Sequence, residues 1–393
     1  PFRLVMHILV MSRTTLGHSL GGMQKQMMDL CEGFIAKGHQ VSVITTARKD
    51  GVAHEITDGL ETHYLAGCKP EHYSQKWNNL ARKKIAEIHQ TKPINIIHSQ
   101  SMGAYGILKW AKKNSVPIVS TWHGTSLTEI PTFFASASYH PRHWHWLLIM
   151  PTTMLTRYFT KDLAVRKASK KITLVSPTLE KNMKFFARDK VVTVTNGIEL
   201  PTVFVKPTTK PIECIAIGRM EKEKGIHYAI TAIANLTPTL QQSVLLNVVG
   251  EGTYLGDLKK LATKLNVDNS VKFHGRTDDS TLKRIYQKSR IHLMPTTRQE
   301  GLPLTILEGM ANSMATIASN IGGIPGVITD GVDGILTTPG NQSELDQTLH
   351  NLLSNEEMIN RIGESARKTT EERYSKQRMI DETLAVLIGV IEK

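Results

Sequence analysis

The sequence predicts an α/β protein made of two doubly wound domains, each with a mainly parallel sheet covered by helices. Short apolar, β-branched runs alternate with longer amphipathic stretches along the whole chain, as expected when helices connect parallel strands. Both halves of the chain show this same alternation. At 393 residues the chain is also too long for one ordinary core. We therefore expect two Rossmann-like domains of similar architecture.

The strands expected in the first half are residues 3–11, 40–46, 94–98, 116–121, 171–175 and 191–195. Those expected in the second half are 212–218, 243–249, 270–274, 290–294, 315–319 and 334–337. Between the halves, residues 199–211 carry three prolines, which restrict the backbone and interrupt any helical or strand periodicity. We place the linker there and expect domains at 1–200 and 201–393. The last stretch, about 371–393, has a helical pattern and can pack back on the first domain.

Composition limits the class of protein. Hydrophobic residues make up 40% of the chain and charged residues 21%, as in an average folded protein. The three cysteines are isolated and have no metal-site or redox-pair spacing, which favours a reducing cytoplasm. No signal-peptide pattern precedes the first strand. The longest apolar stretch, 144–155, is too short to cross a bilayer, which needs about 20 residues.

The positive charge lies in the first half. Residues 1–200 contain 26 Lys and Arg against 13 Asp and Glu, whereas residues 201–393 contain 22 of each kind, so the net charge of +13 belongs to the first domain. This asymmetry indicates contact with a polyanion, and a basic surface that only aids solubility is the alternative. Basic residues concentrate in 151–171, directly after two tryptophans. An anionic membrane surface is the favoured polyanion, with contact expected at Trp144, Trp146, Arg166, Lys167, Lys170 and Lys171.

Two loops that follow predicted strands contain residues suited to phosphate. Residues 17–24 carry three glycines between a strand and a helix, where backbone N–H groups can approach phosphate oxygens. A tight turn that needs glycine for steric reasons explains this pattern equally well. In the second half, Arg219 and Lys224 follow strand 212–218 at the sheet edge and can neutralise a diphosphate. The alternative is a solvated charge run in which nearby glutamates pair with the lysines.

A third segment, residues 300–311, follows strand 290–294. Pro303 suits the first turn of a helix, so Glu300 falls in the preceding loop and Glu308 inside the helix. An ordinary helix cap explains Glu300 as well as a binding role does.

These motifs together resemble the retaining GT-B glycosyltransferases of family 4 over essentially the whole chain. The resemblance rests on a series of motifs in order: Gly21-Gly22, Thr121-Trp122-His123-Gly124, Asn196-Gly197-Ile198-Glu199, Gly218-Arg219 with Lys224-Gly225, Val249-Gly250-Glu251-Gly252, and the Glu300/Glu308 pair. It implies a GT-B fold, with the two domains facing each other across a cleft. The first domain would bind the acceptor and the second the nucleotide sugar.

The resemblance also implies a role for each matching residue. Glu300 would hold donor-sugar hydroxyls and His123 would orient the sugar, which makes these two the expected catalytic residues. Donor-binding roles fall to Gly22, Arg219, Lys224, Arg276, Leu304, Thr305 and Glu308: diphosphate for the cations and the backbone amides, base for Arg276, ribose for Glu308. Gly326 stands where many relatives carry Glu, and Asn312-Ser313 replaces a common pair of small residues, so the sugar is left open.

By resemblance, the protein is a metal-independent hexosyltransferase with no cofactor. It would move sugar from a nucleoside-diphosphate sugar, with a UDP-sugar favoured, to a hydroxyl of a lipid-linked or cell-surface glycan acceptor. The expected location is cytoplasmic and peripheral on the inner face of the membrane. The same chemistry on a small soluble acceptor is the main alternative. A non-catalytic nucleotide-sugar binder is a remote one, and a nucleic-acid partner is not expected because no recognised nucleic-acid module is present.

Overall fold

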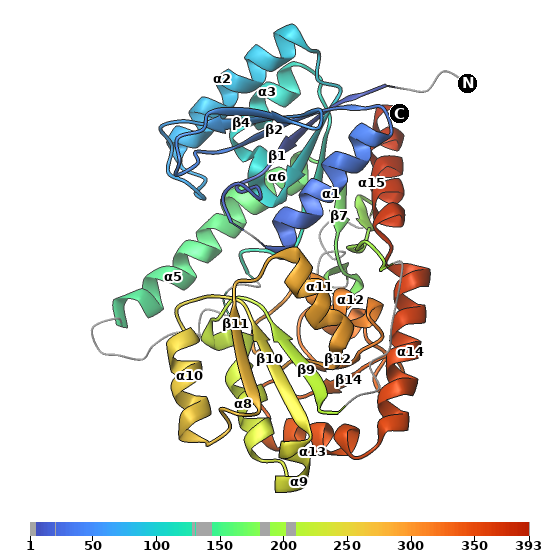
Figure 1. Ribbon diagram of the computed structural model, residues 1–393. Coiled ribbons are helices and arrows are strands. Elements are labelled where there is room, and N and C mark those ends of the chain that lie inside the picture. The colour runs from blue at the N-terminus through green and yellow to red at the C-terminus, as the bar shows by residue number, and fades with distance from the viewer. Residues whose placement is uncertain are drawn as a thin grey trace. The chain divides into compact units, whose positions relative to one another are not determined.

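The computed structural model describes residues 5–19, 21–127, 130, 144–180, 189–201 and 210–392, without the side chains of 144–148. The chain forms two compact units, each built around its own sheet (Figure 1). Unit 1 contains the described residues up to Asn196 together with those from Lys376 onward, and unit 2 contains Gly197–Ser375. The C-terminal end of the chain therefore belongs to the same unit as the N-terminal end.

Unit 1 is built on an eight-stranded sheet in the order β3-β4-β2-β1-β5-β6-β7-β8, parallel except for the β3–β4 pair. Its strands are β1 (His7–Met11), β2 (Gln40–Thr46), β3 (His54–Thr57), β4 (Leu60–Leu65), β5 (Ile96–Gln100), β6 (Ile118–Trp122), β7 (Lys171–Leu174) and β8 (Val191–Thr193). Its helices include α1 (Gly22–Ala36), α2 (Gln75–Thr91), η1 (Ser101–Ile107), α3 (Leu108–Lys113), α5 (Trp144–Arg157), η3 (Tyr158–Asp162), α6 (Leu163–Ala168) and α15 (Lys376–Ile391).

Strand β1 shows why the central strands of this sheet are rich in apolar residues. Ile8 and Val10 pack with α1 and α15 on one face of the sheet. Leu9 and Met11 pack with α2 and η1 on the other face. Alternate side chains of a strand point to opposite faces, so helices on both faces favour consecutive apolar residues.

Helix α15 packs on α1, which fixes the C-terminal end of the chain to unit 1 (Figure 1). Gly33 of α1 leaves room for Ile380, since a Cβ built on Gly33 would lie 2.4 Å from the Ile380 Cδ1 atom. Lys376 Nζ lies 2.8 Å from an Asp29 carboxylate oxygen. Apolar contact and ion pairing therefore hold α15 in the first unit of the chain.

Unit 2 contains a six-stranded parallel sheet in the order β11-β10-β9-β12-β13-β14. Its strands are β9 (Ile212–Ile217), β10 (Val244–Val249), β11 (Val271–Gly275), β12 (Ser289–Met294), β13 (Ala315–Ser319) and β14 (Ile335–Thr337). Its helices include η4 (Lys222–Lys224), α8 (Ile226–Ala234), α9 (Pro238–Gln242), α10 (Leu255–Lys264), α11 (Asp279–Lys288), α12 (Leu304–Ala311), η5 (Ile324–Gly326), α13 (Gln342–Leu353) and α14 (Glu356–Arg373). Numbered within the sheet, this is the 3-2-1-4-5-6 order of a Rossmann domain, whose ligands bind at the carboxyl ends of the strands.

The prediction of two α/β domains with parallel sheets is confirmed, and every strand expected from the sequence is present with its ends shifted by a few residues. The antiparallel hairpin of β3 and β4 was not predicted. No helix in the described part of the chain combines the length and the apolar character that a membrane span requires.

Candidate functional site

Loops from several strands of unit 2 meet at one edge of the sheet. Because all six strands are parallel, their carboxyl ends lie at the same edge. The loop after β12 is tied to the loop after β9: the Thr297 N–H and the Thr296 hydroxyl both donate to the Glu223 carbonyl oxygen, at 2.9 and 3.0 Å. These hydrogen bonds hold two loops of charged residues in contact with each other.

Gly225 makes this close approach possible. It adopts φ +73°, and a Cβ at this position would lie 1.8 Å from the Pro295 carbonyl oxygen. A side chain would therefore force the two loops apart. The preceding residue, Lys224, is held beside the loop that carries Glu300.

Lys224 and Glu300 form an ion pair across these loops. The Lys224 Nζ and Glu300 Oε1 atoms are 2.5 Å apart, and the two side chains are only 17% and 15% exposed. Charge-assisted hydrogen bonds gain strength as water is excluded. Lys224 thus pairs with Glu300, 76 residues away, and not with Glu221 or Glu223 of its own loop.

Glu300 does not cap the helix that follows it. Helix α12 starts at Leu304 after Pro303, and no side chain caps its N-terminus. The position of Glu300 is fixed through its backbone, because its carbonyl oxygen accepts a hydrogen bond from the Gly323 N–H at 2.8 Å. Gly322 has φ +62°, and a Cβ there would lie 2.3 Å from the same oxygen. The capping explanation is therefore wrong.

Arg219 lies on the same loop as Lys224 but is more open to water. Its side chain is 57% exposed and its Nη1 atom lies 2.7 Å from Glu221 Oε1. Arg298, which sequence analysis missed, lies 3.8 Å from Glu221 and 3.7 Å from Glu223. Its position two residues before Glu300, in a loop after a strand, was the available signal. Arg219, Lys224 and Arg298 thus lie on the two loops that meet here.

Helix α12 carries three further predicted residues. Glu308 Oε2 accepts a hydrogen bond of 2.7 Å from the Tyr286 hydroxyl of α11. Burial and the neighbouring Glu308 raise the pKa of Tyr286 well above its ordinary value, so the phenol stays a donor. The Thr305 hydroxyl contacts the Met294 sulfur at 3.8 Å, and Leu304 is the first residue of the helix. The backbone N–H groups of this first turn form the positive end of the helix dipole.

Arg276 follows Gly275, which ends β11 with φ +65°. The Arg276 side chain is exposed. Within the described residues it forms no hydrogen bond or ion pair with Lys224, Glu300 or Glu308. The structure therefore places Arg276 at the expected sheet edge without joining it to the charged pair.

Two of the predicted donor-site residues lie in unit 1, Gly22 at the start of a helix and His123 directly after a strand. Gly22 is the first residue of α1, whose N-terminus has no side-chain cap. His123 follows β6, and its Nε2 atom lies 3.1 Å from Gln100 Oε1 at the end of β5. Burial lowers the pKa of His123 to about 4, so the ring is neutral at pH 7. A neutral imidazole can donate from one nitrogen and accept at the other.

Buried neutral histidines make the folded state sensitive to acid. Burial lowers the pKa of His292 to about 4, and both ring nitrogens are buried without a hydrogen-bond partner. The unfolded chain binds this proton below about pH 6.5 and the folded chain only below about pH 4, so stability falls as pH drops through that window. We expect His292→Leu to remove about 2 kcal/mol of the loss between pH 7.5 and pH 5. Urea unfolding at pH 7.5 and pH 5 measures this change in the free energy of unfolding. The control is His72→Leu, which removes an exposed histidine. Equal pH dependence of stability in both variants would contradict the role of His292.

The expected membrane contact is corrected at one position. Arg166 is 4% exposed and donates from Nη1 to the Tyr158 hydroxyl at 3.2 Å, so it is not available to a surface. Lys171 is partly buried and its ammonium donates to the Asp189 carbonyl oxygen at 3.0 Å. Lys167 and Lys170 are exposed. The side chains of Trp144 and Trp146 on α5 lie outside the described residues.

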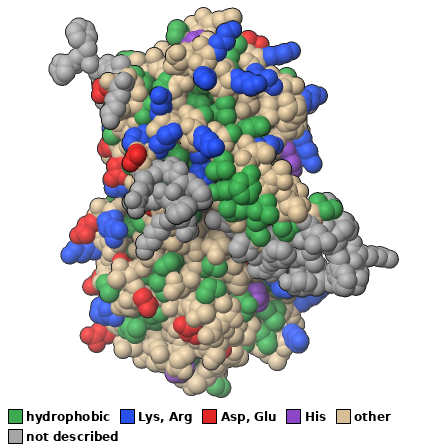
Figure 2. All heavy atoms as spheres, turned by 180° about the vertical axis from the view of Figure 1, so that it is seen from behind, with side chains coloured by type: hydrophobic (Ala, Val, Ile, Leu, Met, Phe, Trp, Pro, Cys, Tyr) green, Lys and Arg blue, Asp and Glu red, His purple; other side chains and the backbone are tan. Residues whose placement is uncertain are grey.

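Apolar side chains are nevertheless exposed along the same segment. Ile149 and Leu155 of α5 are 49% and 39% exposed, and Phe159 is 63% exposed. Helix α5 contains no acidic residue. Figure 2 shows Lys and Arg side chains spread over unit 1, in the upper part of the view, instead of gathered in one cluster. The segment therefore keeps apolar and basic groups at the surface, although fewer basic ones than expected.

Known proteins resemble the chain in sequence and in fold. Glycogen synthase of Mycobacterium tuberculosis is 24% identical, over 98% of this chain and 95% of its own. Sucrose-phosphate synthase from Thermosynechococcus elongatus superposes with a TM-score of 0.78 at 16% identity, covering 98% of this chain and 99% of that chain. HepE from Anabaena, solved in complex with UDP-glucose, gives a TM-score of 0.71 at 16% identity, covering 98% and 100%.

Two family models match adjacent parts of the chain. Glycosyltransferase Family 4 matches residues 20–201, and Glycosyl transferases group 1 matches residues 202–369. The two matches meet within the proline-containing linker and leave only the ends of the chain uncovered. With two Rossmann-like units and loops of cations and acids at the carboxyl edge of the second sheet, the chain belongs to the GT-B glycosyltransferases of these two families.

Proposed function

We propose that this protein transfers a sugar from a UDP-sugar to a hydroxyl of a lipid-linked or cell-surface glycan, with retention of anomeric configuration and without a metal. The observation that carries the proposal is the Lys224–Glu300 pair, 2.5 Å apart at the carboxyl edge of the unit 2 sheet. It offers a cation for the diphosphate and a carboxylate for sugar hydroxyls, side by side.

The chemistry requires stabilisation of the negative charge that leaves on the diphosphate. Lys224 and Arg219 provide fixed positive charge, and the uncapped N-terminus of α12 provides backbone N–H donors. Glu308, held by Tyr286, is suited to accept hydrogen bonds from the ribose. These groups are set in place by the loop contacts of the free protein, so little reorganisation is needed during the reaction.

In the proposed step, the bond between the anomeric carbon and the diphosphate oxygen breaks while the acceptor oxygen bonds to the same face of that carbon. The acceptor proton passes to the departing phosphate oxygen, so no enzyme carboxylate is glycosylated. His123, neutral at pH 7, would orient the sugar by hydrogen bonding. Glu300 would hold the sugar hydroxyls and position the anomeric carbon.

The UDP-glucose complex of the Anabaena relative supports a uridine donor. Thermal unfolding with UDP-, GDP- and ADP-sugars, together with hydrolysis of each donor, tests this proposal. We expect a UDP-sugar to raise the melting temperature and to be hydrolysed slowly. Stabilisation by GDP- or ADP-sugars alone would contradict the uridine assignment, and no response to any donor would contradict the proposed function.

We expect activity to survive complete chelation. Lys224 and Arg219 supply positive charge where a metal would otherwise neutralise the diphosphate. Turnover measured before and after EDTA treatment and desalting should be unchanged. Loss of turnover that only magnesium or manganese restores would show that a metal takes part.

Membrane contact is the proposed way of reaching a lipid-linked acceptor. We expect phosphatidylglycerol vesicles to bind the protein in a salt-sensitive manner. The double variant Lys167→Glu and Lys170→Glu should bind about tenfold more weakly or worse, because each basic residue contributes about 1 kcal/mol near an anionic surface. The control is Lys259→Glu with Lys260→Glu, which makes the same charge change at exposed positions of α10. Equal binding by both double variants, or no binding at low salt, would favour a small soluble acceptor.

A further inference from the structure

We propose that His54, Glu61 and His63 form a zinc site on the β3–β4 hairpin of unit 1. The three side chains offer one ligand atom each, and these atoms all lie within 4.8 Å of one another. These residues belong to unit 1, and the proposed transfer reaction does not use them.

Strand pairing brings the three side chains together. His54 of β3 lies directly opposite His63 of β4, and their rings stack with centroids 4.8 Å apart and planes at 24°. Glu61 lies two residues before His63, so both point to the same face of β4. Strand pairing thus places the ligand atoms of two imidazoles and a carboxylate within 4.8 Å of one another.

The distances fit a zinc ion. Glu61 Oε1 lies 3.3 Å from the Nε2 atoms of both His54 and His63. In a tetrahedral zinc site with bonds of about 2.0–2.1 Å, neighbouring ligand atoms are roughly 3.3 Å apart. Imidazole and carboxylate are common zinc ligands, and three protein ligands leave a fourth position for water.

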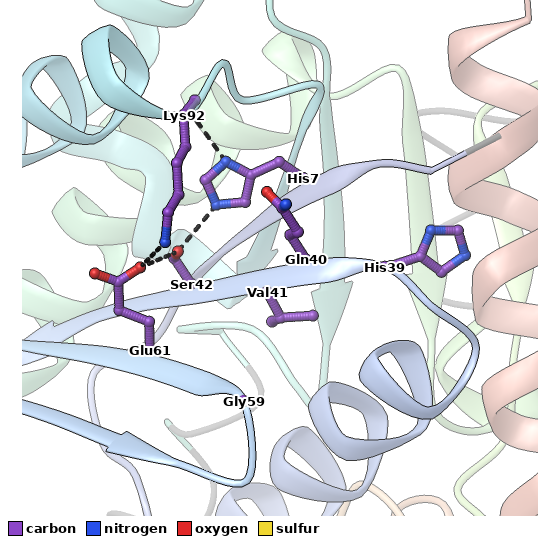
Figure 3. Close-up of a pocket in the computed structure, with 8 residues that line it drawn as sticks. All are labelled: His7, His39, Gln40, Val41, Ser42, Gly59, Glu61 and Lys92. Carbon is purple, nitrogen blue, oxygen red and sulfur yellow. Dashed lines mark hydrogen bonds and ion pairs between the residues drawn. The ribbon is translucent and has the colours of Figure 1, made fainter.

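The second carboxylate oxygen of Glu61 is already held. Glu61 Oε2 lies 3.0 Å from Lys92 Nζ and accepts from the Ser42 hydroxyl at 3.3 Å. Figure 3 shows Glu61 reaching toward Lys92 and Ser42 in a small pocket that His7 also lines. Contacts of this kind orient a ligating carboxylate and leave Oε1 free to face the histidines.

His63 lacks a hydrogen-bond partner of good geometry. Its side chain is 12% exposed, and its Nε2 atom is buried without a hydrogen bond of good geometry. The Nε2 lone pair of an imidazole and a carboxylate oxygen 3.3 Å away are favourably bridged by a cation. Bound zinc would also tie β3, an edge strand, to the sheet.

Calorimetric titration of the chelator-treated full chain with zinc chloride at pH 7.5 tests the proposal. We expect one equivalent to bind, and His54→Gln and His63→Gln each to lower the affinity about tenfold or more. His72→Gln, which removes an exposed histidine of the same unit, should bind as the wild type does. Cobalt chloride should give the visible absorption of a four-coordinate site in the wild type and in His72→Gln only.

The His54 variant keeps the test valid if His63→Gln fails to fold, because the His54 side chain is 46% exposed and its loss should leave the fold intact. Circular dichroism checks the fold of each variant. Absence of stoichiometric zinc binding in the wild type, or unchanged affinity in a folded His54→Gln protein, would overturn the assignment.

Discussion

Replacing Lys224 with alanine is expected to weaken UDP binding about tenfold or more while leaving the fold intact. Lys224 is the most enclosed cation of the predicted donor site, with a side chain 17% exposed. A hydrogen bond to a charged group contributes about 1.5–3 kcal/mol, and 1.4 kcal/mol corresponds to tenfold in affinity. The substitution also leaves Glu300 partly buried without its cation, next to the incoming phosphates.

Calorimetric titration with UDP measures this effect. Arg219→Ala should cause a smaller loss, because the Arg219 side chain is 57% exposed and already paired with Glu221. The matched control is Lys222→Ala, which removes an exposed lysine from the same loop and should not change affinity. Unchanged affinity in both Lys224→Ala and Arg219→Ala would remove these residues from the donor site.

Replacing Glu300 with glutamine is expected to lower turnover about 100-fold with little loss of UDP affinity. A displacement of about 1 Å at the reacting centre is enough for a 100-fold loss of rate. UDP lacks the transferred sugar that Glu300 is proposed to hold, and removal of the carboxylate frees Lys224 for the diphosphate, so UDP binding should be equal or tighter. His123→Ala should behave in the same way, because its proposed role is also toward the sugar.

Steady-state turnover and UDP affinity must be measured on the same preparations. Glu357→Gln, an exposed position on α14, is the control for the loss of one carboxylate charge. Parallel losses of turnover and UDP affinity in Glu300→Gln and His123→Ala would place these residues outside the sugar site.

Most strands of both sheets could be predicted because burial on both faces leaves short runs rich in apolar and β-branched residues in the sequence. The hairpin of β3 and β4 lacks such a run, since β3 is exposed along its whole length. Its signal was the turn between the strands. Asp58 and Gly59 have φ of +49° and +82°, and an Asp-Gly pair is favoured in tight hairpins of this kind.

Side-chain partners were harder to predict than elements. The residues of the Lys224–Glu300 pair are far apart in the sequence, and their contact depends on Gly225 letting two loops approach. Sequence alone left pairing within the Arg219–Lys224 loop open as an alternative and gave no sign of a pair with Glu300. Arg166 was expected in an exposed basic cluster, but its guanidinium is buried against Tyr158, eight residues earlier. The helical pattern of the sequence did not show that Arg166 would be buried and its neighbour Lys167 exposed.

Proton NMR of the transfer reaction tests the central claim most directly. The enzyme is incubated with a glycan acceptor and the UDP-sugar that stabilises it most, and the anomeric proton of the product is compared with that of the donor. We expect a new glycoside with the same anomeric configuration as the donor, together with free UDP. A product of inverted configuration would contradict the proposed front-side displacement, and donor bound without transfer to any hydroxyl would contradict the proposed activity.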